Sequence, residues 1–167
     1  MSTIPRERSC STARSESSML DMVRRHFAAH HDLWLNNQDK LDDGRPDVLY
    51  VLNEPGVFDR YGWLEGKMVR IVRDRDEHKF ASGLSVAQSF KLKRWAERHG
   101  MHTFMLLGIV DRMYLIPGTA GCVHEYAKKF TLDEYNGEAI FSARINGDGC
   151  AALRNFLVDY HKNTRRK

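Results

Sequence analysis

Two neighbouring stretches decide the fold of this chain: GRPDVLYV at residues 44–51 and WLEGKMVR at residues 63–70. The pattern predicts two β-strands joined by a turn. Because successive side chains of a strand point to opposite faces, Glu65 and Lys67 are predicted to lie on the same face. If the two strands pair, Asp47 at the head of the first strand joins that face.

Asp47, Glu65 and Lys67 together form a chemically meaningful set. Two carboxylates and one ammonium group suit a hard divalent cation that holds a phosphate and a water molecule, with the lysine beside that water as positioner or proton acceptor. The pattern therefore predicts a phosphodiester-cleaving site. An alternative without function remains open, in which Asp47 is a turn residue after a proline and Glu65 and Lys67 form a solvated hairpin face.

These residues resemble the PD-(D/E)xK nuclease superfamily. Pro46-Asp47 stands where that superfamily has its PD, and Glu65-Gly66-Lys67 stands where it has ExK, eighteen residues further on. The resemblance implies a restriction-endonuclease-like core and a Mg²⁺- or Mn²⁺-dependent nuclease.

A first helix is predicted from about residue 15 to 28, with Ser15 as its N-cap. Its apolar residues recur at the spacing of an amphipathic helix, and Glu16 falls on the same face. The resemblance implies that Glu16 is an acid that points into the metal site. Interaction of Glu16 with the helix N-terminus is an equal alternative. The apolar residues are Met19, Leu20, Val23 and Phe27.

A second helix is predicted at residues 85–99, where Ser85 and Gln88 have capping-box spacing and Gly100 ends the helix. A Leu-Ser-x-x-Gln helix followed by a buried strand resembles the branch that includes archaeal Holliday-junction resolvases and VRR-type nucleases. In that branch a glutamine lies beside the catalytic lysine, and Gln88 is the matching residue. The resemblance covers about residues 16–110. The predicted apolar set of this helix is Leu84, Val86, Phe90, Leu92 and Trp95.

Further candidates flank the predicted site. Gly66 is unusual inside a strand, and a close backbone approach explains it; its carbonyl is a candidate metal ligand. Four arginines are candidates for contacts to the phosphate backbone of nucleic acid. They are Arg45, Arg70, Arg73 and Arg75.

The composition is that of an ordinary soluble globular protein. The chain has 167 residues, 42% hydrophobic and 29% charged, which is enough for one domain with its own core. The net charge of +4 and a sequence pI near 9.0 favour a polyanionic partner. We expect a flexible basic arm at residues 1–14, a single nuclease-like domain at residues 15–162 and a basic tail at residues 163–167.

The three cysteines form no CxxC motif, so the sequence predicts neither a disulfide framework nor a thiolate zinc site. No apolar run approaches the roughly 18 residues needed to cross a membrane, and the N-terminus has no apolar signal core. We therefore expect a cytoplasmic protein, in the host cytoplasm if a phage encodes it. The cysteines are Cys10, Cys122 and Cys150.

The predicted fold is α/β, with a central mixed sheet of four or five strands flanked by helices at about 15–28, 85–99 and 149–162. The predicted strands lie at residues 33–35, 48–52, 63–72, 103–110 and 112–116. The last helix carries an apolar face of Leu153, Phe156, Leu157 and Tyr160, while residues 117–147 match no part of the resembled family.

By resemblance, the function is hydrolysis of DNA phosphodiester bonds, as a structure-selective endonuclease of Holliday-junction-resolvase type acting in DNA recombination. Asp47 and Glu65 would bind Mg²⁺ or Mn²⁺, Lys67 would act on the attacking water, and Gln88 would support the lysine or contact the phosphate. Expected partners are DNA, including branched DNA, and a second copy in a homodimer. The alternative is a catalytically inactive nuclease-fold protein that serves as a nucleic-acid-binding or assembly factor.

Overall fold

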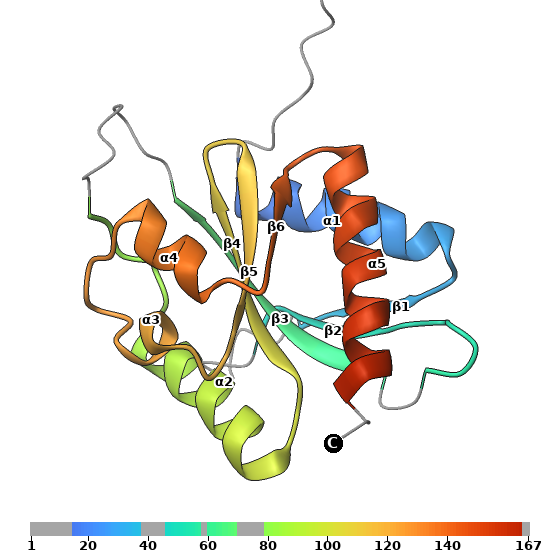
Figure 1. Ribbon diagram of the computed structural model, residues 1–167, viewed down its shortest axis with the longest axis horizontal. Helices are drawn as coiled ribbons and strands as arrows, with labels where there is room; N and C mark the ends of the chain where they lie inside the picture. The colour runs from blue at the N-terminus through green and yellow to red at the C-terminus, as the bar shows by residue number, and fades with distance from the viewer. Residues whose placement is uncertain (1–14, 38–45, 58–59, 70–78, 165–167) are drawn as a thin grey trace, which may run out of the picture.

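The computed structural model describes residues 15–37, 46–57, 60–69 and 79–164 of the chain (Figure 1). The predicted arm at residues 1–14 and the end of the predicted tail lie outside the described residues. Within them, six strands form one sheet in the order β1-β2-β3-β4-β5-β6. The strands are β1 (Leu33–Asn36), β2 (Val48–Val51), β3 (Tyr61–Val69), β4 (Thr103–Ile109), β5 (Arg112–Pro117) and β6 (Phe141–Arg144).

The sheet is mixed, because β3 and β4 run parallel while the other neighbouring strands are antiparallel. The connection between β3 and β4 contains α2, as a parallel crossover requires. The helices are α1 (Glu16–Ala29), α2 (Val86–His99), α3 (Gly121–His124), α4 (Leu132–Glu138) and α5 (Gly147–Asn163). The predicted α/β class with a mixed sheet and flanking helices is confirmed. The described sheet has six strands instead of four or five, because β6 pairs with β5.

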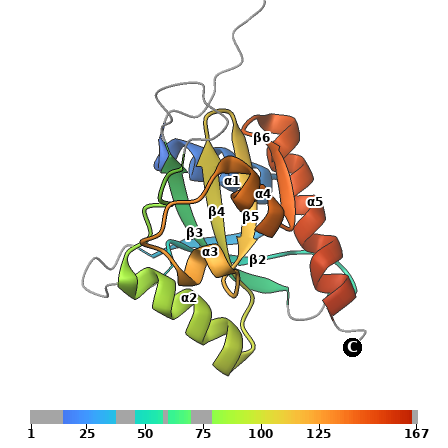
Figure 2. The ribbon, with the colours of Figure 1, turned by 60° about the vertical axis from the view of Figure 1, so that its left-hand side comes forward.

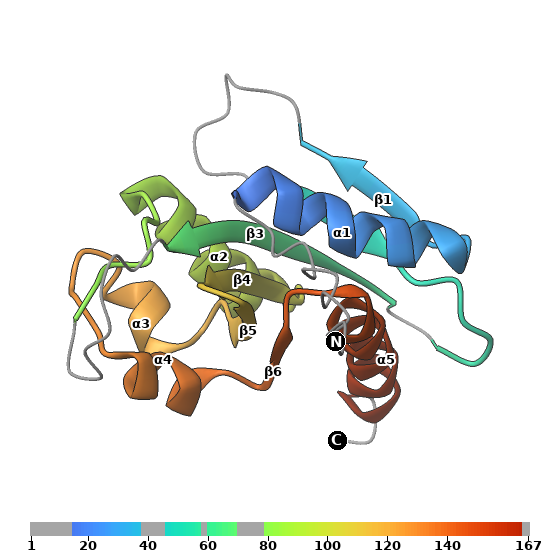
Figure 3. The same cartoon turned by 90° about the horizontal axis from the view of Figure 1, so that it is seen from above.

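Helices cover both faces of the sheet. On one face, α1 and α5 pack against β3, β4 and β5, and Figure 3 shows α1 running along β1 to β3. On the other face lie α2, α3 and α4, of which Figure 2 shows α4 in front of β4 and β5. Alternate residues of β4 supply both cores: Phe104 and Leu106 face α1 and α5, while Met105 and Leu107 face α2 to α4. This explains why the whole of β4 is buried.

The predicted helix boundaries are confirmed by their caps. Ser15 caps α1, and Ser85 with Gln88 forms the capping box of α2. Gly100 ends α2 in the left-handed conformation, with φ of 61°. Buried Leu153 and Leu157 confirm the predicted inner face of α5.

The predicted apolar set of α2 is partly wrong. Leu84 and Leu92 are buried, but Val86 and Phe90 are 63% and 58% exposed. The buried side of the helix carries Leu92 and Ser89, and the Ser89 hydroxyl donates to the Val123 carbonyl of α3. Two residues advance a helix by about 200°, so Phe90 points away from the side on which Leu92 is buried.

Residues 117–147, which match no part of the resembled family, complete the core that lies on the α2 side of the sheet. Tyr135 of α4 is fully buried, stacks on Phe80 with ring centroids 5.1 Å apart, and donates its hydroxyl to the Phe80 carbonyl at 3.0 Å. Phe80 and Phe130 pair their backbones in an isolated bridge. This segment therefore closes the face of the sheet beside α2.

The two cysteines in the described part of the chain, Cys122 and Cys150, are buried free thiols. None of the described helices has both the length and the apolar character needed to span a bilayer.

Candidate active site

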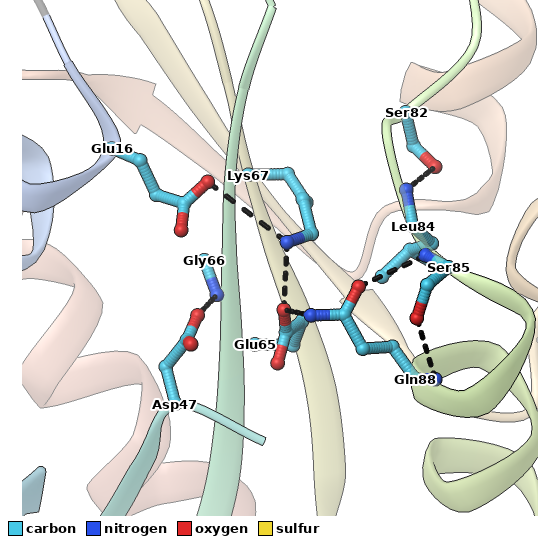
Figure 4. A network of polar contacts seen from close by, with 9 residues as sticks. All are labelled: Glu16, Asp47, Glu65, Gly66, Lys67, Ser82, Leu84, Ser85 and Gln88. Atoms are coloured by element: carbon cyan, nitrogen blue, oxygen red, sulfur yellow. Dashed lines mark hydrogen bonds and ion pairs between the residues drawn. The ribbon is translucent and has the colours of Figure 1, made fainter. Parts of the chain in front are cut away.

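The site is built where β2 begins beside the middle of β3. The antiparallel register pairs Val48 with Leu64, so the next residues outward, Asp47 and Glu65, stand opposite each other. The Gly66 N–H donates to Asp47 Oδ2 at 2.8 Å (Figure 4). This hydrogen bond fixes the carboxylate of Asp47 against β3, as the predicted pairing of the two strands required.

Glu65 is the buried centre of the site, and its side chain is 0% exposed. Its Oε1 accepts from Lys67 Nζ at 2.8 Å and from the side-chain amide of Gln88. Its Oε2 is buried and has no hydrogen-bond partner within the described structure. A buried carboxylate oxygen without a partner is costly, and it is a position that a cation can satisfy.

Gln88 serves both as a helix cap and as a site residue. Its side-chain Oε1 accepts from the backbone N–H of Ser85 at 2.9 Å, and the backbone N–H of Gln88 donates to Ser85 Oγ at 3.2 Å. Because the amide oxygen is held by the cap, the amide NH₂ is directed at Glu65. Gln88 and Lys67 thus meet at one shared carboxylate oxygen of Glu65, and the predicted role of Gln88 in supporting the lysine stays a prediction.

Glu16 reaches the same site from the other face of the sheet. It occupies the first turn of α1, on the face that buries Met19, Val23 and Phe27, as predicted. Its Oε2 lies 4.0 Å from Lys67 Nζ. Figure 4 shows the lysine between Glu16 and Glu65. Glu16 thus lies in the first turn of α1 and beside Lys67, while both proposed roles of Glu16 stay predictions.

Gly66 is required by close packing of α1. A Cβ atom at this position would lie 2.9 Å from Cδ1 of Leu20 and 3.1 Å from its Cγ. The Trp63 N–H donates to the His102 carbonyl on the β4 side. The backbone N–H and C=O groups of successive strand residues point alternately to the two sides of the strand. Those of Gly66 therefore point to the β2 side, just past Val48 and Leu64, the last paired residues of β2 and β3. The Gly66 carbonyl is thus directed to the same side as Asp47. The unusual position of Gly66 inside a strand could be recognised from the sequence, but its packing against Leu20 could not be predicted.

The electrostatics show an excess of negative charge. Burial, followed by the charge of Asp47, raises the pKa of Glu65 to about 7 despite the opposing effect of Lys67. Burial also raises the pKa of Asp47 and of Glu16. Burial alone would lower the pKa of Lys67, but Glu65, Glu16 and Asp47 together raise it. One ammonium group therefore does not balance three converging carboxyl groups, and the site favours additional positive charge.

The donors present fit a hard divalent cation in part. Carboxylate and carbonyl oxygens are the preferred ligands of Mg²⁺ and Mn²⁺, and Asp47, Glu65 Oε2 and the Gly66 carbonyl supply them. Among the described residues, however, no three His, Cys, Asp or Glu side chains are grouped closely enough to hold a metal by themselves. The set that fits is thus two carboxylates and a backbone carbonyl completed by water or phosphate oxygens. Glu16 as a metal ligand stays a prediction.

The four arginines predicted to contact phosphate lie outside the described residues, at positions 45, 70, 73 and 75. Their role stays a prediction. They are Arg45, Arg70, Arg73 and Arg75.

No protein-family model matches this chain, and no curated protein matches it in sequence. Among solved structures, it is similar to Hjc, a Holliday junction resolvase from the archaeal hyperthermophile Archaeoglobus fulgidus. That match has 13% sequence identity and a TM-score of 0.44, and it covers 81% of this chain and 95% of that chain. The similarity is weak.

Proposed function

We propose that this protein is a metal-dependent nuclease of the PD-(D/E)xK type that hydrolyses DNA phosphodiester bonds. The observation that carries the proposal is the convergence of Asp47, Glu65 and Lys67 where β2 meets β3, with one buried oxygen of Glu65 left without a partner. A purely structural ion pair would satisfy both carboxylate oxygens, because an unsatisfied buried acceptor is destabilising.

Asp47, Glu65 and the Gly66 carbonyl are proposed to hold Mg²⁺ or Mn²⁺ beside the scissile phosphate. When bound, such an ion polarises the phosphoryl oxygen and lowers the pKa of a water ligand. Gln88 fixes the Glu65 carboxylate, because the cap at Ser85 sets the orientation of its amide.

Lys67 is proposed to orient the attacking water and to stabilise charge on the phosphate. Its carboxylate neighbours raise its pKa, so the ammonium form prevails at neutral pH. A protonated lysine donates hydrogen bonds but does not accept a proton. The positioning role is therefore favoured over the role of proton acceptor, and Glu16 holds the ammonium from the other side.

The test is cleavage of a DNA panel containing supercoiled plasmid, linear duplex, single strand, flap and four-way junction, with Mg²⁺, Mn²⁺ or chelator. We expect wild type to cut at least one DNA only with metal, and Lys67→Ala to lose that activity. Lys93→Ala, which removes a lysine from α2 away from Glu65, is the matched control and should cut like wild type. A preference for the junction would support the resolvase-type assignment.

If wild type binds DNA but cuts no member of the panel with either metal, the nuclease proposal fails. The inactive nucleic-acid-binding or assembly factor would then be the better description. Action on branched DNA in recombination, a homodimer and a phage origin stay predictions.

A further inference from the structure

No helix in the described part of the chain covers one face of the sheet at β1, β2 and the start of β3. Val48, Tyr50 and Leu64 face α1 and α5 and are buried, but the alternate side chains point the other way. These form an apolar surface on the side of the sheet that carries Glu65. It consists of Leu33, Leu35 and Tyr61, which are 49%, 48% and 42% exposed, and of the partly buried Leu49, Val51 and Trp63.

This surface continues directly into the candidate active site. Tyr61, Trp63, Glu65 and Lys67 are alternate residues of β3 and share one face; we call them the β3 row. Neighbours in the row are about 7 Å apart, because a strand rises about 3.3 Å per residue. An aromatic pair therefore lies in line with the proposed catalytic pair.

The edge of α2 runs beside the β3 row and adds positive charge. Two contacts fix its course: Gln88 donates to Glu65, and Trp95 meets Trp63 with ring centroids 5.1 Å apart. Residues three or four apart share a side of a helix, so Lys91 and Arg98 flank Trp95 along this edge. A cationic edge thus accompanies the aromatic residues away from the site.

We propose that the β3 row binds a single-stranded segment of nucleic acid next to the scissile phosphate, with bases stacked on Tyr61 and Trp63. Lys91 and Arg98 would contact its phosphates. Aromatic side chains beside a positive groove are the usual means of holding single strands. Stacked bases in a duplex are about 3.4 Å apart, half the spacing of the row, so separate bases reach Tyr61 and Trp63 only when the strand is unstacked.

A second copy of the chain fits this surface less well. A standard interface buries about 800 Å² on each partner, and three half-exposed side chains offer well under that. The cationic edge of α2 favours a polyanion over another molecule of the same net positive charge. The choice of ligand rests on the proposed function, but its test reads binding alone.

The test compares the binding of three fluorescein-labelled probes in chelator: an oligothymidylate, an abasic strand of the same length and a duplex of the same length. Wild type is expected to bind the oligothymidylate most tightly, and this comparison needs no variant. Tyr61→Leu should weaken oligothymidylate binding by about tenfold, within the range for loss of one stacked base. Its binding of the abasic strand should stay within about twofold, because the phosphates are unchanged.

Two controls sharpen the result. Tyr61→Phe keeps the ring and should bind like wild type. Phe90→Leu removes an exposed aromatic residue on the outer face of α2 and should leave all three affinities unchanged.

Equal wild-type affinity for the oligothymidylate and the abasic strand would overturn the proposal. So would equal effects of Tyr61→Leu and Phe90→Leu, or light scattering that shows a dimer which Tyr61→Leu dissociates. If cleavage fails while the stacking pattern is present, only the nuclease proposal falls. If metal-dependent cleavage is found without the stacking pattern, only this inference falls.

Discussion

Replacing Glu65 by Gln should flatten the pH dependence of stability in the metal-free protein. The pKa of Glu65 is raised from 4.5 to about 7 in the folded state. A carboxyl group with a raised folded-state pKa stabilises the fold while it is protonated, and that contribution is lost as the pH rises through about 7. Between pH 5 and pH 8 this loss amounts to about 2.5 kcal/mol for wild type, since one pKa unit corresponds to about 1.4 kcal/mol.

The variant lacks this titrating group, so its free energy of unfolding should fall by about 2.5 kcal/mol less over the same interval. For a chain of this size that corresponds to roughly 5–10 °C in the thermal midpoint. Asp47 and Glu16 also have raised pKa values and act in the same direction, so only the difference between wild type and Glu65→Gln isolates Glu65. The assay is urea denaturation in chelator at several pH values. Parallel wild-type and variant profiles would refute the assigned environment of Glu65.

Three further outcomes follow from the structure. Mg²⁺ should bind about tenfold more weakly at pH 6 than at pH 8, because protonated Glu65 must first lose its proton; equal thermal shifts by Mg²⁺ at both pH values would argue against Glu65 as a ligand. Gly66→Ala should destabilise the fold by about 1–3 kcal/mol in chemical denaturation, and adding Leu20→Ala should recover part of that loss, because the two side chains compete for one space. Arg154→Met should cost about 3–5 kcal/mol of unfolding free energy, since buried Asp32 loses a two-pronged ion pair at 2.6 and 3.0 Å; a loss below about 1 kcal/mol would show that this pair contributes little.

Much of the site could be predicted because local patterns fix it. Period-two alternation placed Glu65 and Lys67 on one face, and pairing of the two strands brought Asp47 to them. The capping box located Gln88 at the N-terminus of a helix, and only the cap is local; the contact of Gln88 with Glu65 of β3 joins residues 23 positions apart. The same alternation places Trp63 in line with Glu65, but Tyr61 lies outside the predicted strand, which began at residue 63, whereas β3 begins at Tyr61.

The rest depends on contacts between distant segments. Tyr135 is buried because Phe80 and Phe130 pack around its ring. The sequence of the short helix α4 does not by itself indicate that Tyr135 is buried. The ion pair between Asp32 and Arg154 joins residues 122 positions apart. Periodicity alone also misjudged Phe90, because it shows that a helix has an apolar side but not which part of that side a neighbouring element covers.

Binding of Mn²⁺ tests the central claim, that Asp47 and Glu65 form a divalent-cation site. The free ion can be counted by electron paramagnetic resonance while wild type, Asp47→Asn and the control Asp148→Asn are titrated; Asp148 is an exposed acid of α5. We predict saturable binding by wild type and Asp148→Asn. Asp47→Asn should bind Mn²⁺ more weakly by at least roughly 10- to 100-fold. That is the loss of metal affinity usually caused by removing a group that only hydrogen-bonds to a metal ligand. Equal Mn²⁺ affinity of wild type and Asp47→Asn would contradict the proposed site.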